Sequence, residues 1–270
     1  MPSNAELAEI ALTVARRAAA FALQRRQDGV EVAATKSSLA DIVTRADRET
    51  ETLIRDALAA ARPRDAFFGE ESGGAEGTSG LTWVVDPIDG TVNYFYGIPA
   101  WAVSVAVVEG GNDPSTWRTL AGAVVNPVAG EAFTAFAGGG ARLNGTPLRV
   151  TSHVDLGLAL VGTGFGYEAS IRERQAEFVG QLIGRVRDIR RIGAASLDLC
   201  SVAAGRLDAY FERGLNPWDH AAGALIAQEA GARVGGLGDR PAGSRLLVAA
   251  EPGLFEALNP IVQEFYSRWE

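Results

Sequence analysis

The spacing of apolar residues along the chain predicts a series of helices and strands. Apolar side chains recur at helical spacing over residues 5–27, 45–61, 170–187, 195–204, 217–230 and 252–267. Short runs rich in β-branched and aromatic residues predict strands at 66–68, 83–85, 101–108, 120–125, 131–137, 158–162, 207–211 and 246–249. The strands between residues 101 and 137 follow one another through short turns, which predicts antiparallel pairing.

The pattern changes near residue 150, from mainly strands to an alternation of strands and helices. We therefore expect residues 1–150 to form an N-terminal α+β half and residues 151–270 to form a C-terminal α/β half, packed as one compact unit. A chain of 270 residues is long enough for a substantial core. Its 47% hydrophobic and 21% charged residues are ordinary for a soluble globular protein.

Charge and cysteine content narrow the possible functions. A formal net charge of -8 argues against a nucleic-acid surface as the main function. Cys200 is the single cysteine, so no disulfide can form within the chain, which fits a reducing cytoplasm. We find no basic N-terminal segment followed by an apolar core, and no apolar run that could span a bilayer. The expected location is therefore the cytoplasm.

The stretch that follows the strand at 83–85 carries the clearest chemistry. Pro87 lacks an N–H and is expected to end this strand, which leaves Asp86 at its carboxyl end. Asp89 follows across a tight turn. Two carboxylates this close repel each other unless one is protonated or a cation lies between them. Mg²⁺ is the natural cation for ligands that are all oxygen.

The two residues after Asp89 suit a phosphate. Gly90 lets a ligand approach the backbone closely, and Thr91 adds a hydroxyl and an N–H. If a helix starts here, its free N–H groups favour an anion. A lone pair of aspartates at this spacing is more often an acidic turn than a metal site. The rest of the chain therefore decides between the two interpretations.

Three further carboxylates lie where a site could form. Glu70 follows a predicted strand and could be a third oxygen ligand or a solvated loop residue. Asp47 lies in the first turn of a predicted helix, where the helix dipole alone explains it; a functional Asp47 would have to point toward the metal site. Asp219 also lies in the first turn of a helix, close to where a site could open.

Taken together, these motifs resemble the inositol monophosphatase family, over nearly the whole chain. The resemblance rests on Gly69-Glu70-Glu71-Ser72, Asp86-Pro87-Ile88-Asp89-Gly90-Thr91-Val92-Asn93 and Trp218-Asp219-x-Ala-Ala-Gly, with Asp41-x-Val-Thr-x-x-Asp47 and Lys36 in agreement. The ending Val92-Asn93 and the stretch from Arg190 to Cys200 resemble bacterial, especially actinobacterial, inositol-1-monophosphatases.

The resemblance implies a layered αβαβα sandwich of the inositol monophosphatase and fructose-1,6-bisphosphatase type. It also implies a phosphomonoesterase that uses about two to three Mg²⁺ ions per subunit, with Mn²⁺ as a substitute, and is inhibited by Li⁺. Carried over by position, the metal ligands are the carboxylates of Glu70, Asp86, Asp89 and Asp219 and the carbonyl of Ile88.

The resemblance also implies roles in the reaction itself. Glu70 and Thr91 would orient the attacking water, with Asp47 polarising Thr91. The backbone amides of Gly90 and Thr91 would hold the phosphate. The residues expected to contact the hydroxyls of the substrate are Asp89, Ala195, Glu212 and Asp219.

The implied reaction is hydrolysis of myo-inositol 1-phosphate by a metal-activated water, in a homodimer that uses neither membrane nor nucleic acid. Family members also hydrolyse histidinol phosphate, sugar phosphates and NADP, so histidinol-phosphate phosphatase stays open as an alternative. They often carry Ser or Thr where this chain has Ala194, which puts substrate affinity or selectivity in doubt. A different class also stays open, because some bacterial relatives act as binding proteins in transcription or RNA processing.

Overall fold

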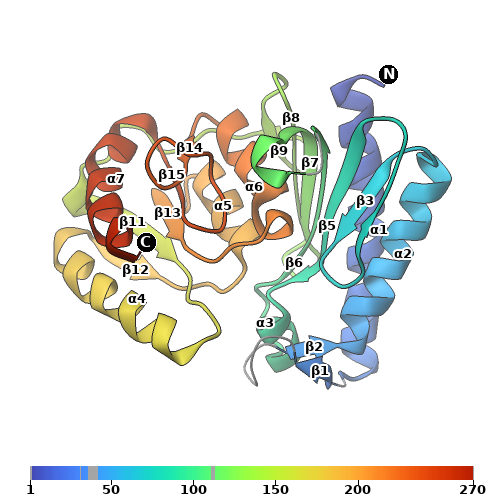
Figure 1. The fold of residues 1–270 in the computed structure, drawn as a ribbon, viewed down its shortest axis with the longest axis horizontal. Coiled ribbons are helices and arrows are strands. Elements are labelled where there is room, and N and C mark those ends of the chain that lie inside the picture. Colours follow the sequence, from blue (N-terminus) through green and yellow to red (C-terminus); the bar gives the residue numbers. More distant parts are fainter. Residues whose placement is uncertain (1, 31, 36–41, 111–112, 270) are drawn as a thin grey trace.

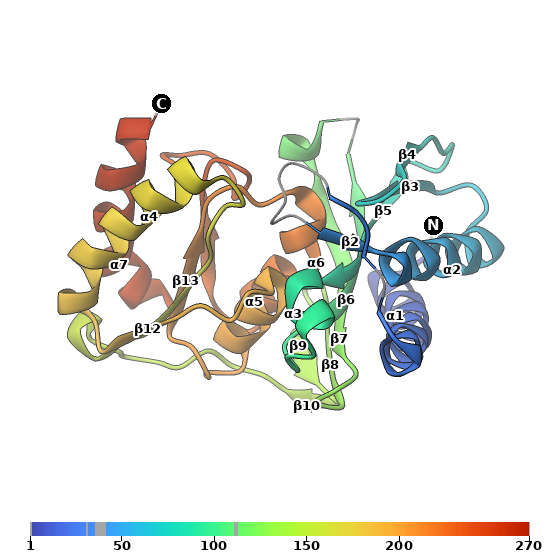
Figure 2. The same ribbon diagram turned by 90° about the horizontal axis from the view of Figure 1, so that it is seen from below.

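Helices and sheets alternate in five layers across the molecule, as Figures 1 and 2 show from two directions. The computed structural model describes residues 2–30, 32–35, 42–110 and 113–269, so Lys36 and Asp41 lie outside the described residues. The helices of the three helical layers are α1 (Asn4–Asp28) with α2 (Arg45–Ala61), α5 (Ala195–Ala203) with α6 (Pro217–Glu229), and α4 (Ala169–Leu182) with α7 (Pro252–Tyr266). This arrangement confirms the expected αβαβα sandwich.

An eight-stranded sheet lies between the first and second helical layers. Its strand order is β10-β9-β8-β7-β6-β5-β3-β4. The strands are β3 (Ala66–Gly69), β4 (Gly73–Ala75), β5 (Leu81–Asp89), β6 (Ala102–Glu109), β7 (Arg118–Asn126), β8 (Glu131–Phe136), β9 (Ala141–Leu143) and β10 (Thr146–Pro147). Neighbours pair antiparallel, as predicted for the strands from β6 to β8, and only β3 and β5 pair parallel.

A five-stranded sheet lies between the second and third helical layers, in the order β12-β11-β13-β15-β14. Its strands are β11 (Leu160–Thr163), β12 (Asp188–Arg190), β13 (Ala209–Glu212), β14 (Arg233–Gly235) and β15 (Leu247–Ala250). Strand β11 pairs parallel with both β12 and β13. Along the chain, α4 connects β11 to β12 and α5 connects β12 to β13, and such helical crossovers are what parallel neighbours need. The two large sheets draw their strands from either side of residue 150, and the division into two halves there stays a prediction.

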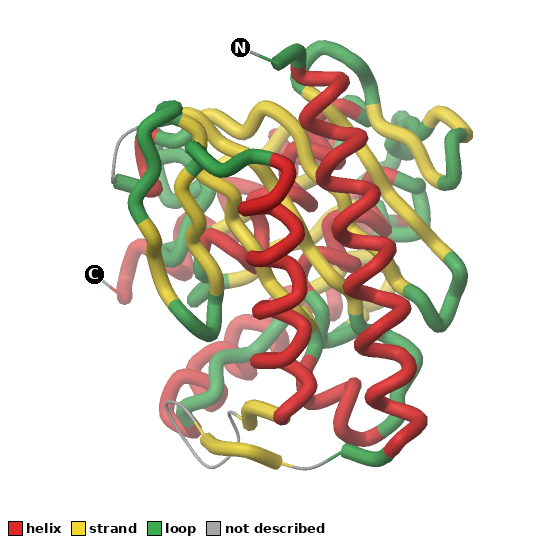
Figure 3. The backbone as a smooth tube through the Cα atoms, turned by 90° about the vertical axis from the view of Figure 1, so that its right-hand side faces the viewer, coloured by secondary structure: helices red, strands yellow, loops and turns green. Residues whose placement is uncertain are grey.

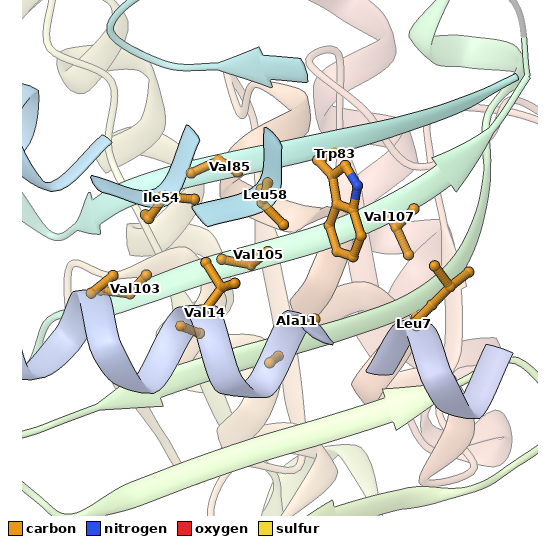
Figure 4. Close-up of a cluster of buried hydrophobic side chains, with 14 of the residues drawn as sticks. Leu7, Ala11, Val14, Ile54, Leu58, Trp83, Val85, Val103, Val105 and Val107 are labelled. Carbon is orange, nitrogen blue, oxygen red and sulfur yellow. The ribbon is translucent and has the colours of Figure 1, made fainter. Parts of the chain in front are cut away.

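The core of the first half lies between helices α1 and α2 and the eight-stranded sheet. The two helices lie side by side across the sheet (Figure 3). In Figure 4, α1 turns Leu7, Ala11 and Val14 toward the sheet, and α2 turns Ile54 toward the same cluster. Alanines at the contact let α1 approach the strands closely, as expected where small side chains face β-branched ones.

Two local predictions were wrong at this level. Helix α1 begins at Asn4, one residue before the predicted start at residue 5, with Ser3 as its N-cap: the Ser3 hydroxyl accepts from the Glu6 N–H at 3.3 Å, and the Glu6 carboxylate accepts from the Ser3 N–H at 2.7 Å. Strand β5 does not stop at Pro87. It continues to Asp89 because the register shifts between Asp86 and Asp89, so that Pro87 needs no ladder hydrogen bond.

Several smaller elements complete the fold. β1 (Val32–Thr35) and β2 (Ile42–Thr44) form a two-stranded sheet, and α3 (Thr91–Tyr96) is a short helix directly after β5. Predicted helix and strand ends are displaced by a few residues, as at α4, which ends at Leu182 and is followed by a 3₁₀ turn. None of the described helices is both long enough and apolar enough to cross a bilayer.

The packing of α2 can be tested at Ile54, which is fully buried between the helix and the sheet. Replacing Ile54 with Ala removes three carbon atoms from a close-packed core and should lower the unfolding free energy by about 2–5 kcal/mol. Urea denaturation measures this change. The matched substitution Leu158→Ala, at a side chain that is 55% exposed, should change it by less than about 0.5 kcal/mol. Equal losses at the two positions would contradict this packing.

Candidate active site

The turn after β5 has the shape that the sequence suggests for a phosphate site. Gly90 has φ 89°, a left-handed conformation, and is the N-cap of α3. A Cβ atom at Gly90 would lie 3.0 Å from the carbonyl oxygen of Ala100 and 3.2 Å from the Ala194 Cβ, so the position suits glycine alone. The Thr91 hydroxyl lies 3.0 Å from both Asp47 Oδ1 and the Ile88 carbonyl oxygen.

Asp47 serves both roles that the sequence left open. It closes a capping box at the start of α2, where the Thr44 N–H donates to Oδ2 at 2.8 Å and the Thr44 hydroxyl donates to the same oxygen. Its other oxygen faces Thr91. The side chain is buried, and burial raises its pKa to about 7 against the lowering effect of the Thr44 hydrogen bonds. The first-turn carboxylate therefore points toward the candidate site.

Four carboxylates from three parts of the chain lie near enough that the charge of Glu70 acts on Asp86, Asp89 and Asp219. Burial raises the pKa of Asp86 well above its ordinary value, and the charge of Glu70 raises it further. A hydrogen bond between the carboxyl groups of Asp86 and Glu70 acts in the same direction. Burial likewise raises the pKa of Asp219, followed by the charges of Glu70 and Asp89. The structure thus brings Glu70, Asp86, Asp89 and Asp219 into one electrostatic site.

The donor chemistry of this site fits a hard divalent cation, since all four side chains offer carboxylate oxygens. Within the described residues, however, no three acidic, histidine or cysteine side chains lie in an arrangement that could hold a metal ion as they stand. Coordination would therefore require these carboxylates to close around the cation.

Asp89 joins the end of β5 to the start of α5. Its Oδ2 accepts from the Ser196 N–H at 2.8 Å and from the Ser196 hydroxyl at 2.5 Å. Its Oδ1 accepts from the Ala195 N–H at 3.2 Å. Ala195 was expected to contact the substrate, but its backbone N–H donates to the Asp89 carboxylate in this structure. Burial raises the pKa of Asp89 to about 6, and the hydrogen bonds from Ser196 oppose this rise.

A second contact ties the same two parts of the chain together. The side-chain amide of Asn93, on α3, donates to the Ala100 carbonyl at 2.7 Å and to the Ile192 carbonyl at 2.9 Å. Asn93 is buried, so these hydrogen bonds are shielded from water. The turn that carries Gly90 and Thr91 is therefore held against the segment that leads into α5.

Glu212 ends β13, where the sequence predicts it. The Tyr210 hydroxyl donates to its carboxylate, and burial raises the pKa of Glu212 to about 7. A Cβ at Gly164 would lie 1.9 Å from Glu212 Oε2. The glycine therefore lets the loop after β11 pack directly against this carboxylate. Asp219 accepts from the Asn216 N–H at 2.6 Å and closes a capping box at the start of α6.

Ser196 and Tyr210 were missed from the sequence, because each acts on a carboxylate through the folded structure. A hydroxyl at the second position of a predicted helix is a weak signal for Ser196. Ala194, where family members often carry a hydroxyl, is buried with its methyl group against Gly90. The nearest side-chain hydroxyl on this segment is therefore that of Ser196, and it bonds Asp89.

Comparisons with known proteins agree with this fold. A model of the inositol monophosphatase family matches residues 3–266. Inositol-1-monophosphatase of Mycobacterium bovis is 49% identical over 260 residues, which covers 93% of this chain and 88% of that protein. The structure of Mycobacterium tuberculosis SuhB has a TM-score of 0.83 at 46% identity and covers 98% of both chains. Nus factor SuhB of Pseudomonas aeruginosa is 42% identical and covers 83% of each chain.

The fold and these relatives define a class of enzymes, the phosphatases that hydrolyse phosphoric monoesters. Within that class, the chain belongs to the inositol monophosphatase family, which is generally metal-dependent. The similarity to mycobacterial proteins confirms the expected resemblance to actinobacterial members.

The buried Asp47 makes the stability of the metal-free protein depend on pH. A carboxyl group whose pKa is higher in the folded state binds more protons there, so the unfolding free energy falls as pH rises from 3.8 toward about 7. Asp47→Asn removes this group and should make the decline between about pH 5 and pH 7 shallower, by about 1–3 kcal/mol.

Urea denaturation at a series of pH values, in the presence of a chelator, measures the two slopes. Asp56→Asn, at an exposed position of the same helix, is the matched control and should keep the slope of the original protein. Parallel pH profiles for the original protein and Asp47→Asn would show that Asp47 carries no raised pKa.

Proposed function

We propose that this protein is a Mg²⁺-dependent inositol-1-monophosphatase, which hydrolyses myo-inositol 1-phosphate to inositol and inorganic phosphate. The observation that carries the proposal is the 49% identity to the Mycobacterium bovis inositol-1-monophosphatase over 93% of the chain. The electrostatic grouping of Glu70, Asp86, Asp89 and Asp219 supports the same reaction, because it provides oxygen donors beside a turn that suits a phosphate.

Metal binding is assigned to the oxygen donors at this site. About two to three Mg²⁺ ions, or Mn²⁺ in their place, would be held by Glu70, Asp86, the Ile88 carbonyl, Asp89 and Asp219. When bound, such ions lower the pKa of a coordinated water and neutralise charge on the phosphate and the leaving oxygen.

The residues of the chain orient the water and the phosphate. The Thr91 hydroxyl has one proton and two acceptors at 3.0 Å, Asp47 Oδ1 and the Ile88 carbonyl. Donation of the Thr91 proton to Asp47 would leave the Ile88 carbonyl free for a cation and would turn a lone pair of the Thr91 oxygen toward the water. Thr91 would accept one hydrogen bond from that water, and Glu70 would accept a second. The N–H groups of Gly90 and Thr91 would hold the phosphate oxygens.

Polar groups around the site would form hydrogen bonds with the hydroxyl groups of the substrate. We assign them to Glu212, which Tyr210 holds in place, to Asp89 and Asp219, and to the backbone at Ala195, whose N–H would have to exchange its hydrogen bond to Asp89 for one to the substrate. The alternative of a binding protein in transcription is not favoured, because the relative named inositol-1-monophosphatase is more similar, at 49% identity, than the relative named as a Nus factor, at 42%.

A phosphate-release panel tests the reaction. Purified protein is assayed with inositol 1-phosphate, histidinol phosphate, fructose 1,6-bisphosphate and NADP, with Mg²⁺ or with a chelator. We expect the highest kcat/KM for inositol 1-phosphate, no turnover with the chelator, and inhibition by Li⁺. A higher kcat/KM for histidinol phosphate would move the assignment to the alternative substrate, and no turnover of any substrate would contradict the proposal.

Asp86→Asn tests the metal site within that panel. It removes one charged ligand at nearly unchanged volume and should lower kcat by at least about 100-fold, since even partners of metal ligands are worth 10–100-fold. Asp239→Asn, at an exposed position, is the matched control and should keep full activity. Full activity of Asp86→Asn, or equal losses in both variants, would remove Asp86 from the site.

The resemblance also carries a proposal about assembly. We propose that the protein forms a homodimer, which only the resemblance to the family implies. Sedimentation velocity at about micromolar concentration measures the mass in solution directly. A sedimentation coefficient for a particle near 57 kDa, twice the chain mass of 28.4 kDa, is the expected result, and a single species of the chain mass would contradict it.

A further inference from the structure

Helix α2 presents two buried carboxylates to the candidate site, one helical turn apart. Asp47 and Glu51 are 1% and 2% exposed, and their spacing of four residues places them on the same face of the helix. Asp47 holds the Thr91 hydroxyl, as described above. Glu51 has no role in the reaction as derived so far, although burying an acidic side chain requires compensating hydrogen bonds.

Both oxygens of Glu51 bind the backbone of the loop that carries Glu70. The Glu71 N–H donates to Glu51 Oε2 at 2.7 Å, and the Ser72 N–H donates to Glu51 Oε1 at 2.8 Å. Hydrogen bonds to an ionised acceptor are roughly twice as strong as those between neutral groups. The carboxylate therefore fixes the two peptide groups that follow Glu70.

The loop is also fitted to this carboxylate from the other side. A Cβ at Gly69 would lie 2.4 Å from Glu51 Oε2, so only glycine allows the backbone to come this close. The Glu70 N–H donates to the Val85 carbonyl at 3.2 Å, which ties Glu70 to the strand that leads into Asp86. Glu70 is thus held on one side by β5 and on the other by Glu51.

We propose that Glu51 is a positioning residue that sets the place of Glu70 relative to Thr91, so that α2 supports both groups that orient the attacking water. Asp47 supports Thr91 and Glu51 supports the Glu70 loop, from adjacent turns of one rigid helix. This inference rests on the proposed function, because it takes Glu70 as a metal ligand and water-orienting group.

The substitution Glu51→Gln separates this role from simple packing. Gln has nearly the same shape, but only one of its two terminal atoms accepts a hydrogen bond. The other is an NH₂ group, which would face a backbone N–H of Glu71 or Ser72, so the loop must shift. Asp56→Asn, an exposed acid-to-amide change on the same helix, is the matched control.

The first readout needs no metal and no substrate. Amide hydrogen exchange of the metal-free protein, followed by NMR, should show that the Glu71 and Ser72 amides exchange at least about 10-fold faster in Glu51→Gln. In Asp56→Asn their exchange should not change. Unchanged exchange in Glu51→Gln would show that the carboxylate does not hold the loop, and would overturn the inference.

The second readout is a double-substitution cycle on kcat, with Mg²⁺ and inositol 1-phosphate. Glu51→Gln should lower kcat about 10–100-fold with little change in KM. In a Glu70→Gln background the same substitution should cause no further loss, because Glu51 acts only through Glu70. An additive loss would show that Glu51 acts elsewhere, and no loss in the single variant would overturn the inference.

The two single variants separate the proposed function of Glu70 from the positioning role of Glu51. If Glu70→Gln keeps full activity, the proposed function of Glu70 fails, whereas the exchange rates still test the hold of Glu51 on the loop. If Glu70→Gln is inactive but Glu51→Gln is fully active, the proposed function stands and the positioning role is wrong. If Glu51→Gln does not fold, Glu51→Asp, which keeps the charge but is one methylene shorter, takes its place and should show smaller losses of the same kind.

Discussion

Repulsion among buried carboxylates is the constraint on which the site depends. The charge of Glu70 raises the pKa of Asp86, Asp89 and Asp219 on top of the effect of burial, and no three of the acidic side chains in the described residues form a ready cradle for a cation. A fold that buries like charges in this way loses stability unless protons or cations neutralise them. The same negative field would favour a highly charged, hard cation, and that cation would supply the positive charge that a phosphate needs in an acidic protein.

The layered fold makes this arrangement possible by bringing distant segments to one place. Strand β5 delivers Asp86 and Asp89, and the first turns of α2 and α6 deliver Asp47 and Asp219. The two parts of the chain are joined by the bonds from Ser196 to Asp89 and by the amide of Asn93. These hydrogen bonds are shielded from water and hold the two parts of the chain together around the acidic groups.

Periodicity predicted most of the helices and strands for a physical reason, whereas their layered arrangement was expected only from the resemblance to the inositol monophosphatase family. Helical and strand periodicity are local properties, and each of Asp47, Glu70 and Asp219 stands beside a recognisable element end. Pro87 misled the prediction because a bulge in β5 removes the need for its missing N–H. Glu51 and Ser196 could not be predicted, since their partners lie 20 and 107 residues away in the chain. Their importance depends on tertiary contacts that no local pattern records.

The central claim is that divalent cations bind among these four carboxylates. A crystal of the protein grown with Mn²⁺, measured at the manganese absorption edge, locates the metal by its anomalous signal. The account predicts strong peaks within about 2.5 Å of carboxylate oxygens of Glu70, Asp86, Asp89 and Asp219. An anomalous map with no peak among these four side chains, at a Mn²⁺ concentration that supports phosphate release, would contradict it.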